Sequence, residues 1–398
     1  MEKLAIHGGA PVRPTKIFYG RQWVEEDDIA AVDAVLRSDY LTSGPAGESL
    51  KAALCAYTGA KHAVMLNSDT SALHCACLAA GLGPGDELIT TPMTFAASAN
   101  CALYCGARPV FADIDPETYQ IDPRSIEEHI TPRTRAVVAV DYTGALANLP
   151  EIRRICDEHG LVFIEDAAHS VGSRFNGRPV GTMADMTCMS FHPVKTITAG
   201  EGGAVLTDSE ELYRKADLAH SHGITHEEEL MEGAPHEGPW YYEMISLGFN
   251  YRMTDLQAAL LESQLRKLDR FGARRREIVR RYDEAFGPMP ELILQKEYPG
   301  VESYRHLYVL HLDLSKLRCT RREFFDAMSA ENVRCQIHYI PVYWFPYYQH
   351  MGYEKGLCPR AEELYRGIMS IPLYPKMSDQ DVDDVIHAVK KIVEYYRK

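Results

Sequence analysis

Residues 190–203 read Ser190-Phe-His-Pro-Val-Lys195-Thr-Ile-Thr-Ala-Gly-Glu-Gly-Gly203, which places one lysine between an aromatic, proline-containing segment and a glycine-rich turn. A partly desolvated lysine has a lowered pKa, so its neutral amine can attack a carbonyl and form a Schiff base. A lone lysine before a turn is usually only a surface side chain. The segment 163–170 argues against that interpretation, because an apolar strand there runs directly into the carboxylate of Asp166.

Lys195 and Asp166 are the two side chains that pyridoxal phosphate (PLP) chemistry requires. The lysine carries the cofactor, and the carboxylate keeps the pyridine nitrogen of the cofactor protonated. On local sequence alone, Asp166 could instead be the N-cap of a helix. The pair predicts an enzyme that uses PLP.

The bulk composition is ordinary for a large globular enzyme. The 398 residues are 46% hydrophobic and 25% charged, and they are enough for more than one domain. The formal charge of −14 argues against nucleic acid or an anionic membrane surface as the main partner. There is no apolar run of membrane-spanning length, and residues 1–9 are too polar for a signal peptide, so we expect a cytoplasmic protein.

Two features raise the question of a metal site. The ten cysteines lack the spacing of zinc ligands and are typical of small buried hydrophobic residues. A second segment carries four histidines, namely His220, His222, His226 and His236. Because Glu227–Glu229 lie in its middle, we interpret it as an exposed loop over the site or the subunit boundary. We therefore expect no metal.

Short apolar runs alternate with helical stretches between Lys61 and Thr207. Strands are expected at 62–67, 87–90, 109–113, 136–141 and 161–165, and helices at 70–80, at 95–105 and from about Pro150. This alternation predicts βαβ crossovers and an α/β fold with a largely parallel sheet. Ligands in such folds bind beyond the carboxyl ends of the strands. Five residues at or just past these ends form one candidate site: Asn67, Thr91, Asp141, Asp166 and Ser190.

The pattern changes after about Leu256. Long charged helices are expected at 256–270 and 273–286, followed by a strand at 307–314, a helix at 321–329, a strand at 334–339 and a helix from about Asp379. The sequence therefore predicts a large PLP-binding domain over residues 1–255 and a small α+β domain over residues 256–398.

With these residues assembled, the chain resembles the DegT/DnrJ/StrS family of PLP-dependent sugar aminotransferases. The most specific segments are Glu165–Ser170, Ser190–Gly203 and Gly248–Met253. The resemblance implies the PLP-dependent transferase fold type I, which is aspartate aminotransferase-like.

Within the family, the sequence is most similar to enzymes of the pseudaminic acid pathway. Val140–Gly144 and Cys335–Tyr343 carry this similarity. It implies that L-glutamate donates an amino group to the 4-keto carbon of a UDP-4-keto-6-deoxy-N-acetylhexosamine.

The resemblance also implies roles for single residues around the reacting carbon. Lys195 matches the lysine that forms the Schiff base and then moves a proton, and Asp166 matches the partner of the pyridine nitrogen. His169 matches a residue against the cofactor ring or its hydroxyl, although a core histidine remains an alternative. Phe95 matches the aromatic side chain that stacks on the ring, with packing in the core as the alternative.

The phosphate of the cofactor is expected at the start of the helix that follows Asn67. Thr70 and Ser71 match the family's phosphate contacts there, and Ser190 joins them from another strand. Asp69 departs from the family, which often has glycine or alanine at this position. A carboxylate would repel the phosphate, so we expect the Asp69 side chain to turn away.

Asn250 matches a residue that reaches the cofactor phosphate of the neighbouring subunit, which implies a homodimer with shared active sites. Arg252 supports the same interface or forms a surface ion pair. Four residues of the second domain lie where relatives close over the nucleotide-sugar: Tyr304, Arg305, His306 and His338.

Two alternatives to this function stay open at this point. The substrate could be another nucleotide-linked keto-sugar, dTDP- or GDP-linked and 3- or 4-keto. The chain could also be a non-catalytic PLP-binding regulatory protein, but the presence of both Lys195 and Asp166 argues against it. A dehydratase branch of the family has histidine in place of the lysine, so Lys195 also makes that activity a poor match.

Overall fold

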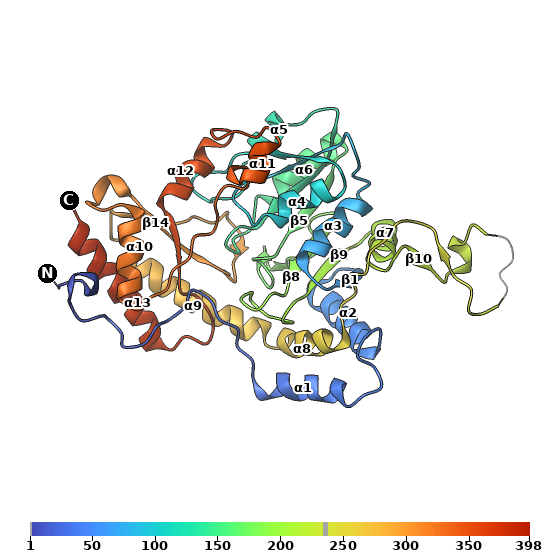
Figure 1. Cartoon of the computed structure of the whole chain (residues 1–398), viewed down its shortest axis with the longest axis horizontal. Coiled ribbons are helices and arrows are strands. Elements are labelled where there is room, and N and C mark those ends of the chain that lie inside the picture. Colours follow the sequence, from blue (N-terminus) through green and yellow to red (C-terminus); the bar gives the residue numbers. More distant parts are fainter. Residues whose placement is uncertain (1, 234–237) are drawn as a thin grey trace.

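A seven-stranded sheet forms the centre of the chain (Figure 1). The computed structural model describes residues 2–233 and 238–398, so Met1 and His236 lie outside the described residues. The strands of the sheet are β1 (His62–Leu66), β2 (Glu87–Thr90), β3 (Arg108–Phe111), β4 (Thr134–Val140), β5 (Val162–Asp166), β8 (Met186–Ser190) and β9 (Gly203–Thr207). Their order is β1-β9-β8-β5-β4-β2-β3, and β9 is the strand that runs antiparallel to its neighbours. The expected α/β fold with a largely parallel sheet is confirmed.

Helices cover both faces of this sheet. The first face is covered by α2 (Pro45–Thr58), α6 (Leu149–His159) and α8 (Asp255–Leu265). The second face is covered by α3 (Asp69–Ala79), α4 (Ala97–Tyr104) and α7 (Glu210–His220). Because both faces are buried, a strand such as β4 is apolar along most of its length instead of alternating.

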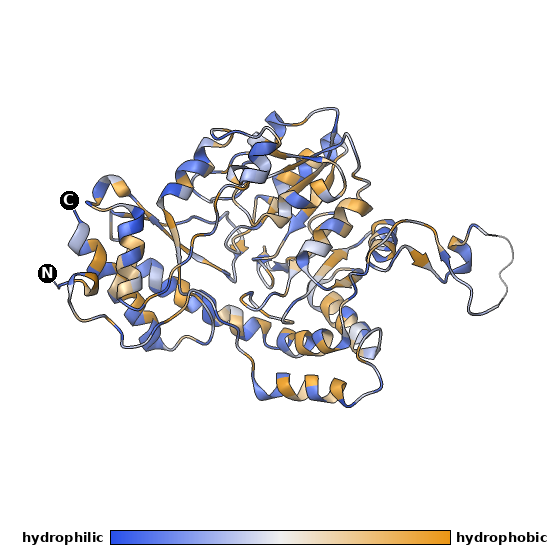
Figure 2. Cartoon of the chain, in the orientation of Figure 1, coloured by the Kyte–Doolittle hydropathy of each residue, from blue (hydrophilic) through white to orange (hydrophobic). Residues whose placement is uncertain are grey.

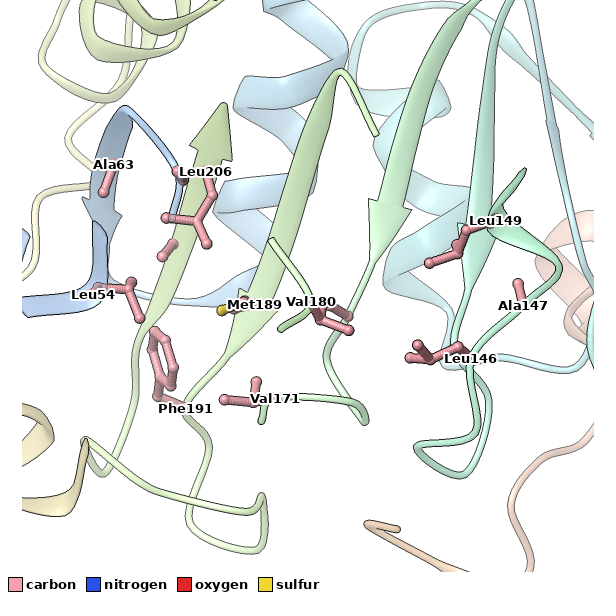
Figure 3. Close-up of a cluster of buried hydrophobic side chains, with 14 of the residues drawn as sticks. Leu54, Ala63, Leu146, Ala147, Leu149, Val171, Val180, Met189, Phe191 and Leu206 are labelled. Carbon is pink, nitrogen blue, oxygen red and sulfur yellow. The ribbon is translucent and has the colours of Figure 1, made fainter. Parts of the chain in front are cut away.

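Two figures show how the apolar residues are distributed. Figure 2 shows hydrophobic and hydrophilic residues interleaved along helices such as α1 and α8. Figure 3 shows part of the core on the first face, to which α2 contributes Leu54 and the strands contribute Ala63, Met189 and Leu206. This core packs against one face of the sheet. The carboxyl ends of the strands lie at the edge of the sheet and carry polar side chains.

Helix α1 (Glu26–Leu36) lies against α8, and α5 (Pro123–Glu128) lies against α6. Polar contacts anchor α1, because Lys267 Nζ donates to carboxyl oxygens of Asp27 and Asp28 at 2.7 and 2.6 Å. No helix in residues 2–233 and 238–398 combines the length and apolar character needed to cross a membrane.

The C-terminal part of the chain has its own core around a three-stranded sheet. Its strands are β12 (Leu292–Ile293), β14 (Tyr308–Leu312) and β15 (Ile368–Ile371), and its helices are α9 (Leu268–Phe286), α10 (Arg321–Ala330), α11 (Pro346–His350), α12 (Pro359–Gly367) and α13 (Asp379–Tyr396). Leu4 and Ile17 are buried in this second core. The N-terminal segment therefore packs with the C-terminal lobe, whereas the division at residue 255 stays a prediction.

Two short sheets and four 3-10 helices complete the described part of the chain. Two short sheets consist of β6 (Arg174–Phe175), β7 (Arg178–Pro179) and β13 (Val301–Glu302), and of β10 (Ile224–Thr225) with β11 (Glu243–Met244). The 3-10 helices are η1 (Ala5–His7), η2 (Glu228–Leu230), η3 (Leu314–Lys316) and η4 (Val342–Trp344). The β10–β11 hairpin projects from the body as an arm (Figure 1).

Two predicted elements differ from the structure. The break between the two long helices lies at residues 266–267 and not near Gly272, which lies inside α9. A Cβ atom at Gly272 would lie 2.2 Å from the Tyr304 ring, so the close packing of this ring requires glycine there. The strand expected at 334–339 does not form. This segment makes a single bridge, Gln336 to Ser370, and then leaves the small sheet to line a cavity.

Candidate active site

A cavity of about 680 Å³ lies where the carboxyl ends of the parallel strands meet the C-terminal lobe. It brings together six of the eight residues that were expected to contact the cofactor: Thr70, Phe95, Asp166, His169, Ser190 and Lys195. These residues come from separate elements, so the fold assembles the site from distant parts of the chain. Ser71 and Asn250 do not line the cavity.

Lys195 lies in the turn after β8, where its amide donates to the His192 carbonyl at 3.0 Å. Burial lowers the pKa of the Lys195 amine to about 8, and the charges of Asp69 and Asp166 oppose this shift. A pKa near 8 leaves a substantial fraction of the amine neutral near neutral pH, and only the neutral amine is a nucleophile.

Asp166 ends β5 and is buried. Its carboxylate accepts hydrogen bonds from the Ser98 hydroxyl at 2.6 Å and from the Ala168 amide at 3.1 Å. Burial raises the pKa of Asp166, while these two hydrogen bonds and the charge of Lys195 act against the rise. The N-cap alternative is wrong, because the chain forms turns and not a helix after Asp166.

His169 and Phe95 form part of the cavity wall. The His169 ring is buried and has a partner at each nitrogen: the Thr143 amide donates to Nδ1 at 3.3 Å, and Nε2 lies 3.0 Å from the Tyr339 hydroxyl. Phe95 is 63% exposed, so it is not a core aromatic. Its ring faces that of Tyr339, with 6.3 Å between the centroids.

The start of helix α3 forms another part of the cavity wall. Ser68 is the N-cap and accepts from the Ser71 amide at 3.2 Å, while the Ser71 hydroxyl donates to Asn67 Oδ1 at 2.8 Å. Ser71 is therefore occupied in the capping box, whereas Thr70 faces the cavity. Gly203 allows the close packing here, because a Cβ atom at this position would lie 2.4 Å from the Ser68 carbonyl oxygen.

The side chain of Asp69 does not turn away, contrary to our expectation. It lines the same cavity as Lys195, and its Oδ1 atom is buried without a hydrogen-bond partner. Burial and the charge of Asp166 raise the pKa of Asp69 well above its ordinary value, and Lys195 acts in the opposite direction. A raised pKa favours the neutral acid, which reduces its repulsion of an anion.

The four residues expected over the nucleotide-sugar separate into two pairs. His306 and His338 line the cavity, and burial lowers the pKa of His338 to about 4, with the charge of Lys195 adding to the effect. Tyr304 and Arg305 do not line it. The Tyr304 hydroxyl donates to Asp269 at 2.8 Å, and Arg305 Nε donates to Glu297 at 2.7 Å.

A turn in the large lobe holds the C-terminal lobe at this point. The Tyr142 hydroxyl donates to the His338 carbonyl, and the His306 amide donates to the Thr143 carbonyl at 2.8 Å. Thr143 and Gly144 have left-handed φ angles of 68° and 96°. A Cβ atom at Gly144 would lie 2.6 Å from the His169 carbonyl oxygen, so this turn requires glycine.

Sequence reasoning did not assign Tyr339 to the site, although its ring lines the cavity. The segment Cys335–Tyr343 supported only a resemblance, and its expected strand would have pointed alternate side chains away from the sheet. The available signal was the polar and aromatic sequence from Gln336 to Tyr339.

These residues fit PLP. The start of α3 offers backbone amides and hydroxyls to a phosphate, Asp166 offers a buried carboxylate to the pyridine nitrogen, and Lys195 offers a nucleophilic amine. Within residues 2–233 and 238–398, no group of three histidine, cysteine or acidic side chains is arranged to hold a metal ion.

Comparison with known proteins identifies the same chemistry. A model of the DegT/DnrJ/EryC1/StrS aminotransferase family matches residues 22–390. The spore coat polysaccharide biosynthesis protein SpsC of Bacillus subtilis (strain 168) is 42% identical over 378 residues, which are 94% of this chain and 97% of SpsC.

Solved structures agree over almost the whole chain. Helicobacter pylori PseC, an aminotransferase involved in the biosynthesis of pseudoaminic acid, has a TM-score of 0.87 at 31% identity and covers 96% of this chain and 100% of its own. The PLP form of Spr1654 from Streptococcus pneumoniae has a TM-score of 0.88 at 29% identity, with 96% and 99% coverage.

The lowered pKa of Lys195 predicts how its reaction with PLP depends on pH. Burial favours the neutral amine, so the rate of adduct formation should rise as the pH passes through about 8 and then level off. An exposed lysine would show this rise at about pH 10.4. The measurement is the rate of borohydride-trappable adduct formation on the cofactor-free protein. Lys195→Ala is the control and should give no adduct; a midpoint near 10, or a reduced pyridoxyl group on another lysine, would contradict the assignment.

The close packing at Gly203 predicts that Gly203→Ala weakens PLP binding. The added Cβ would lie 2.4 Å from the Ser68 carbonyl oxygen and 2.6 Å from the Asp69 amide nitrogen, so the start of α3 must move. Overpacking of this kind should raise the Kd for PLP about 10- to 100-fold in an equilibrium titration. Gly47→Ala is the matched control, because a Cβ at Gly47 meets no atom within 4 Å. Equal Kd values for both variants would show that Gly203 does not position the phosphate end.

Proposed function

Because the chain belongs to the DegT/DnrJ/EryC1/StrS aminotransferase family, we propose that it transfers an amino group from L-glutamate to the 4-keto carbon of a UDP-4-keto-6-deoxy-N-acetylhexosamine. The chain is a PLP-dependent sugar aminotransferase. The proposed product is a UDP-4-amino-4,6-dideoxy-N-acetyl-sugar of a pseudaminic acid-type pathway. The similarity to PseC and SpsC supports this substrate class. A cytoplasmic location and the absence of a nucleic-acid partner stay predictions from the sequence.

One observation supports the amino transfer above all: Lys195 and Asp166 meet in one cavity with the start of α3. PLP, when bound, supplies an electron sink for negative charge that develops on the carbon next to the transferred nitrogen. Asp166 holds a proton at the ring nitrogen, and Lys195 is the base that accepts and returns a proton at that carbon. A regulatory role without catalysis would not need this pair.

The surrounding residues orient the reactants and limit the access of water. We assign Thr70 and Ser190 to the phosphate and Phe95 to one face of the ring, and all three residues line the cavity. His169 is neutral, because burial and the charge of Lys195 lower its pKa well below the usual value. A neutral ring beside Lys195 does not compete for the proton that Lys195 moves.

The alternative substrate is a dTDP- or GDP-linked 3- or 4-keto-sugar, and one spectroscopic experiment separates the candidates. L-Glutamate alone should remove the visible absorption band of the bound cofactor. Adding the correct keto-sugar nucleotide should then restore the band, and UDP-4-keto-6-deoxy-N-acetylglucosamine should do so faster than its dTDP- or GDP-linked counterparts. Faster recovery with a dTDP- or GDP-sugar would replace the proposed substrate, and a band that glutamate does not change would exclude glutamate as the donor.

We also propose a homodimer in which Asn250 completes the active site of the partner subunit. Asn250 is exposed and lies outside the cavity of its own chain, where it forms a bridge with Ser221. A second copy is therefore the way in which this side chain can reach a cofactor phosphate. Arg252 Nη1 donates to the Ser221 hydroxyl at 3.1 Å and so supports the same surface.

The arm next to Asn250 supports this assembly. Several large apolar side chains along it are exposed, namely Trp240, Tyr242, Met244 and Leu247. Exposed apolar residues that gather in one region mark interaction surfaces. The arm projects away from the body of its own chain, so it is placed to contact another copy (Figure 1).

The shared site predicts that two inactive variants complement each other. A mixture of Lys195→Ala and Asn250→Asp chains should regain activity, because each heterodimer has one site with both wild-type residues. Random exchange of subunits should restore about a quarter of the wild-type activity. The Asp in the other site places an extra negative charge near the phosphate, and that site also lacks Lys195.

A matched mixture tests whether the rescue depends on sharing. Lys195→Ala mixed with Asp166→Asn should stay inactive, because Lys195 and Asp166 of one chain line the same cavity. Rescue in both mixtures, rescue in neither after verified subunit exchange, or a fully active monomer would each contradict the shared-site proposal.

A further inference from the structure

The hydrogen bonds of His169 determine where its ring carries a hydrogen. The Thr143 amide donates to Nδ1 at 3.3 Å, so Nδ1 acts as an acceptor and carries no hydrogen. The ring is neutral, since burial and the nearby charge of Lys195 lower its pKa well below the usual value. A neutral imidazole whose Nδ1 accepts a hydrogen bond has its single hydrogen on Nε2.

This tautomer determines the role of the Tyr339 hydroxyl. His169 Nε2 lies 3.0 Å from the Tyr339 oxygen, so Nε2 donates and the tyrosine accepts. The hydrogen of the hydroxyl group is therefore still available to an acceptor. In the part of the chain that the structure describes, the Tyr339 hydroxyl has no other hydrogen-bond partner, and its ring lines the cavity with Lys195.

We propose that the Tyr339 hydroxyl donates a hydrogen bond to the carbonyl oxygen of the keto-substrate and so orients the carbon that receives the amino group. This inference rests on the proposed function, because it takes a ketone as the substrate. Lys195 would hold PLP through its amine, so the substrate carbon that receives nitrogen from the cofactor would react near Lys195. A hydroxyl group in the same cavity as Lys195 is therefore available to the substrate's carbonyl group.

One other ring of the cavity, that of His338, already has a hydrogen-bond partner at one nitrogen. His338 Nδ1 lies 2.9 Å from the Ser370 hydroxyl, which ties that ring to the small sheet. Burial raises the pKa of Tyr339, and the negative charge of Asp166 adds to the rise, so the phenol keeps its hydrogen at working pH. A buried carbonyl oxygen without a donor is unfavourable, and the need for a donor increases as negative charge develops on that oxygen during attack.

Tyr339→Phe tests this proposal because it removes only the hydroxyl group. The variant should bind PLP with the wild-type Kd, absorption spectrum and spectral pH titration. Single-turnover reaction of the pyridoxamine phosphate-loaded enzyme with the keto-sugar should slow by roughly 10- to 100-fold, with a smaller change in the substrate concentration needed for half-saturation. Tyr347→Phe makes the same chemical change on an exposed side chain and should react at the wild-type rate.

Each result has a distinct meaning. A shifted spectrum or spectral pH titration in Tyr339→Phe would overturn the proposal, because the hydroxyl would then act on the cofactor, directly or through His169. A wild-type rate in Tyr339→Phe would overturn it as well, while leaving the proposed function intact. If the wild-type enzyme and Tyr347→Phe react with no keto-sugar nucleotide, the proposed function fails and the assignment of Tyr339 fails with it.

Discussion

The amine of Lys195 shares its cavity with two carboxylates, Asp69 and Asp166, and the balance of their charges with burial governs the site. Burial lowers the pKa of the Lys195 amine, and the negative charge of Asp166, joined by that of Asp69 when Asp69 is ionised, opposes this shift; the balance leaves the Lys195 pKa at about 8. The sheet is the physical origin of this balance. Its parallel strands end at one edge, so β5 delivers Asp166 and β1 leads into Asp69 on the same side. Asp166 is buried at this edge, where charges interact more strongly than they do in water.

Neutral groups complete the site around this charged centre. His169, His306 and His338 all have lowered pKa values because they are buried near the positive charge of Lys195. In a neutral histidine ring, the position of the single N–H hydrogen decides which nitrogen donates and which accepts a hydrogen bond. A contact with a backbone amide can determine that position. The Thr143 amide of the large lobe thus determines the direction of the hydrogen bond between His169 and Tyr339. Tyr339, from the other lobe, accepts that hydrogen bond.

The sequence predicted the parts of the molecule that depend on local pattern. Strands such as β2 and helices such as α3 follow from apolar runs and caps, and the edge position of Asp166 and Ser190 followed from the same pattern. Contacts between distant segments could not be read in this way. Gly272 falls in the gap expected between two helices, but it lies inside α9, where the lack of a side chain leaves room for the Tyr304 ring. Asp69 was expected to avoid the cavity, and Tyr339 was expected in a strand, because neither burial nor the approach of the second lobe is encoded locally.

The turn from Tyr142 to Gly144 joins the two lobes at the point of reaction. Its hydroxyl, carbonyl and amide groups hold the His338 carbonyl, the His306 amide and the His169 ring. A movement that widens the cavity by lifting the C-terminal lobe must first break the contacts to His338 and His306. It also carries Tyr339 away from His169, since Tyr339 directly follows His338 in the chain. The turn therefore ties the alignment of the Tyr339 hydroxyl with His169 to the contact between the two lobes, because one backbone segment holds both His169 and the residue before Tyr339.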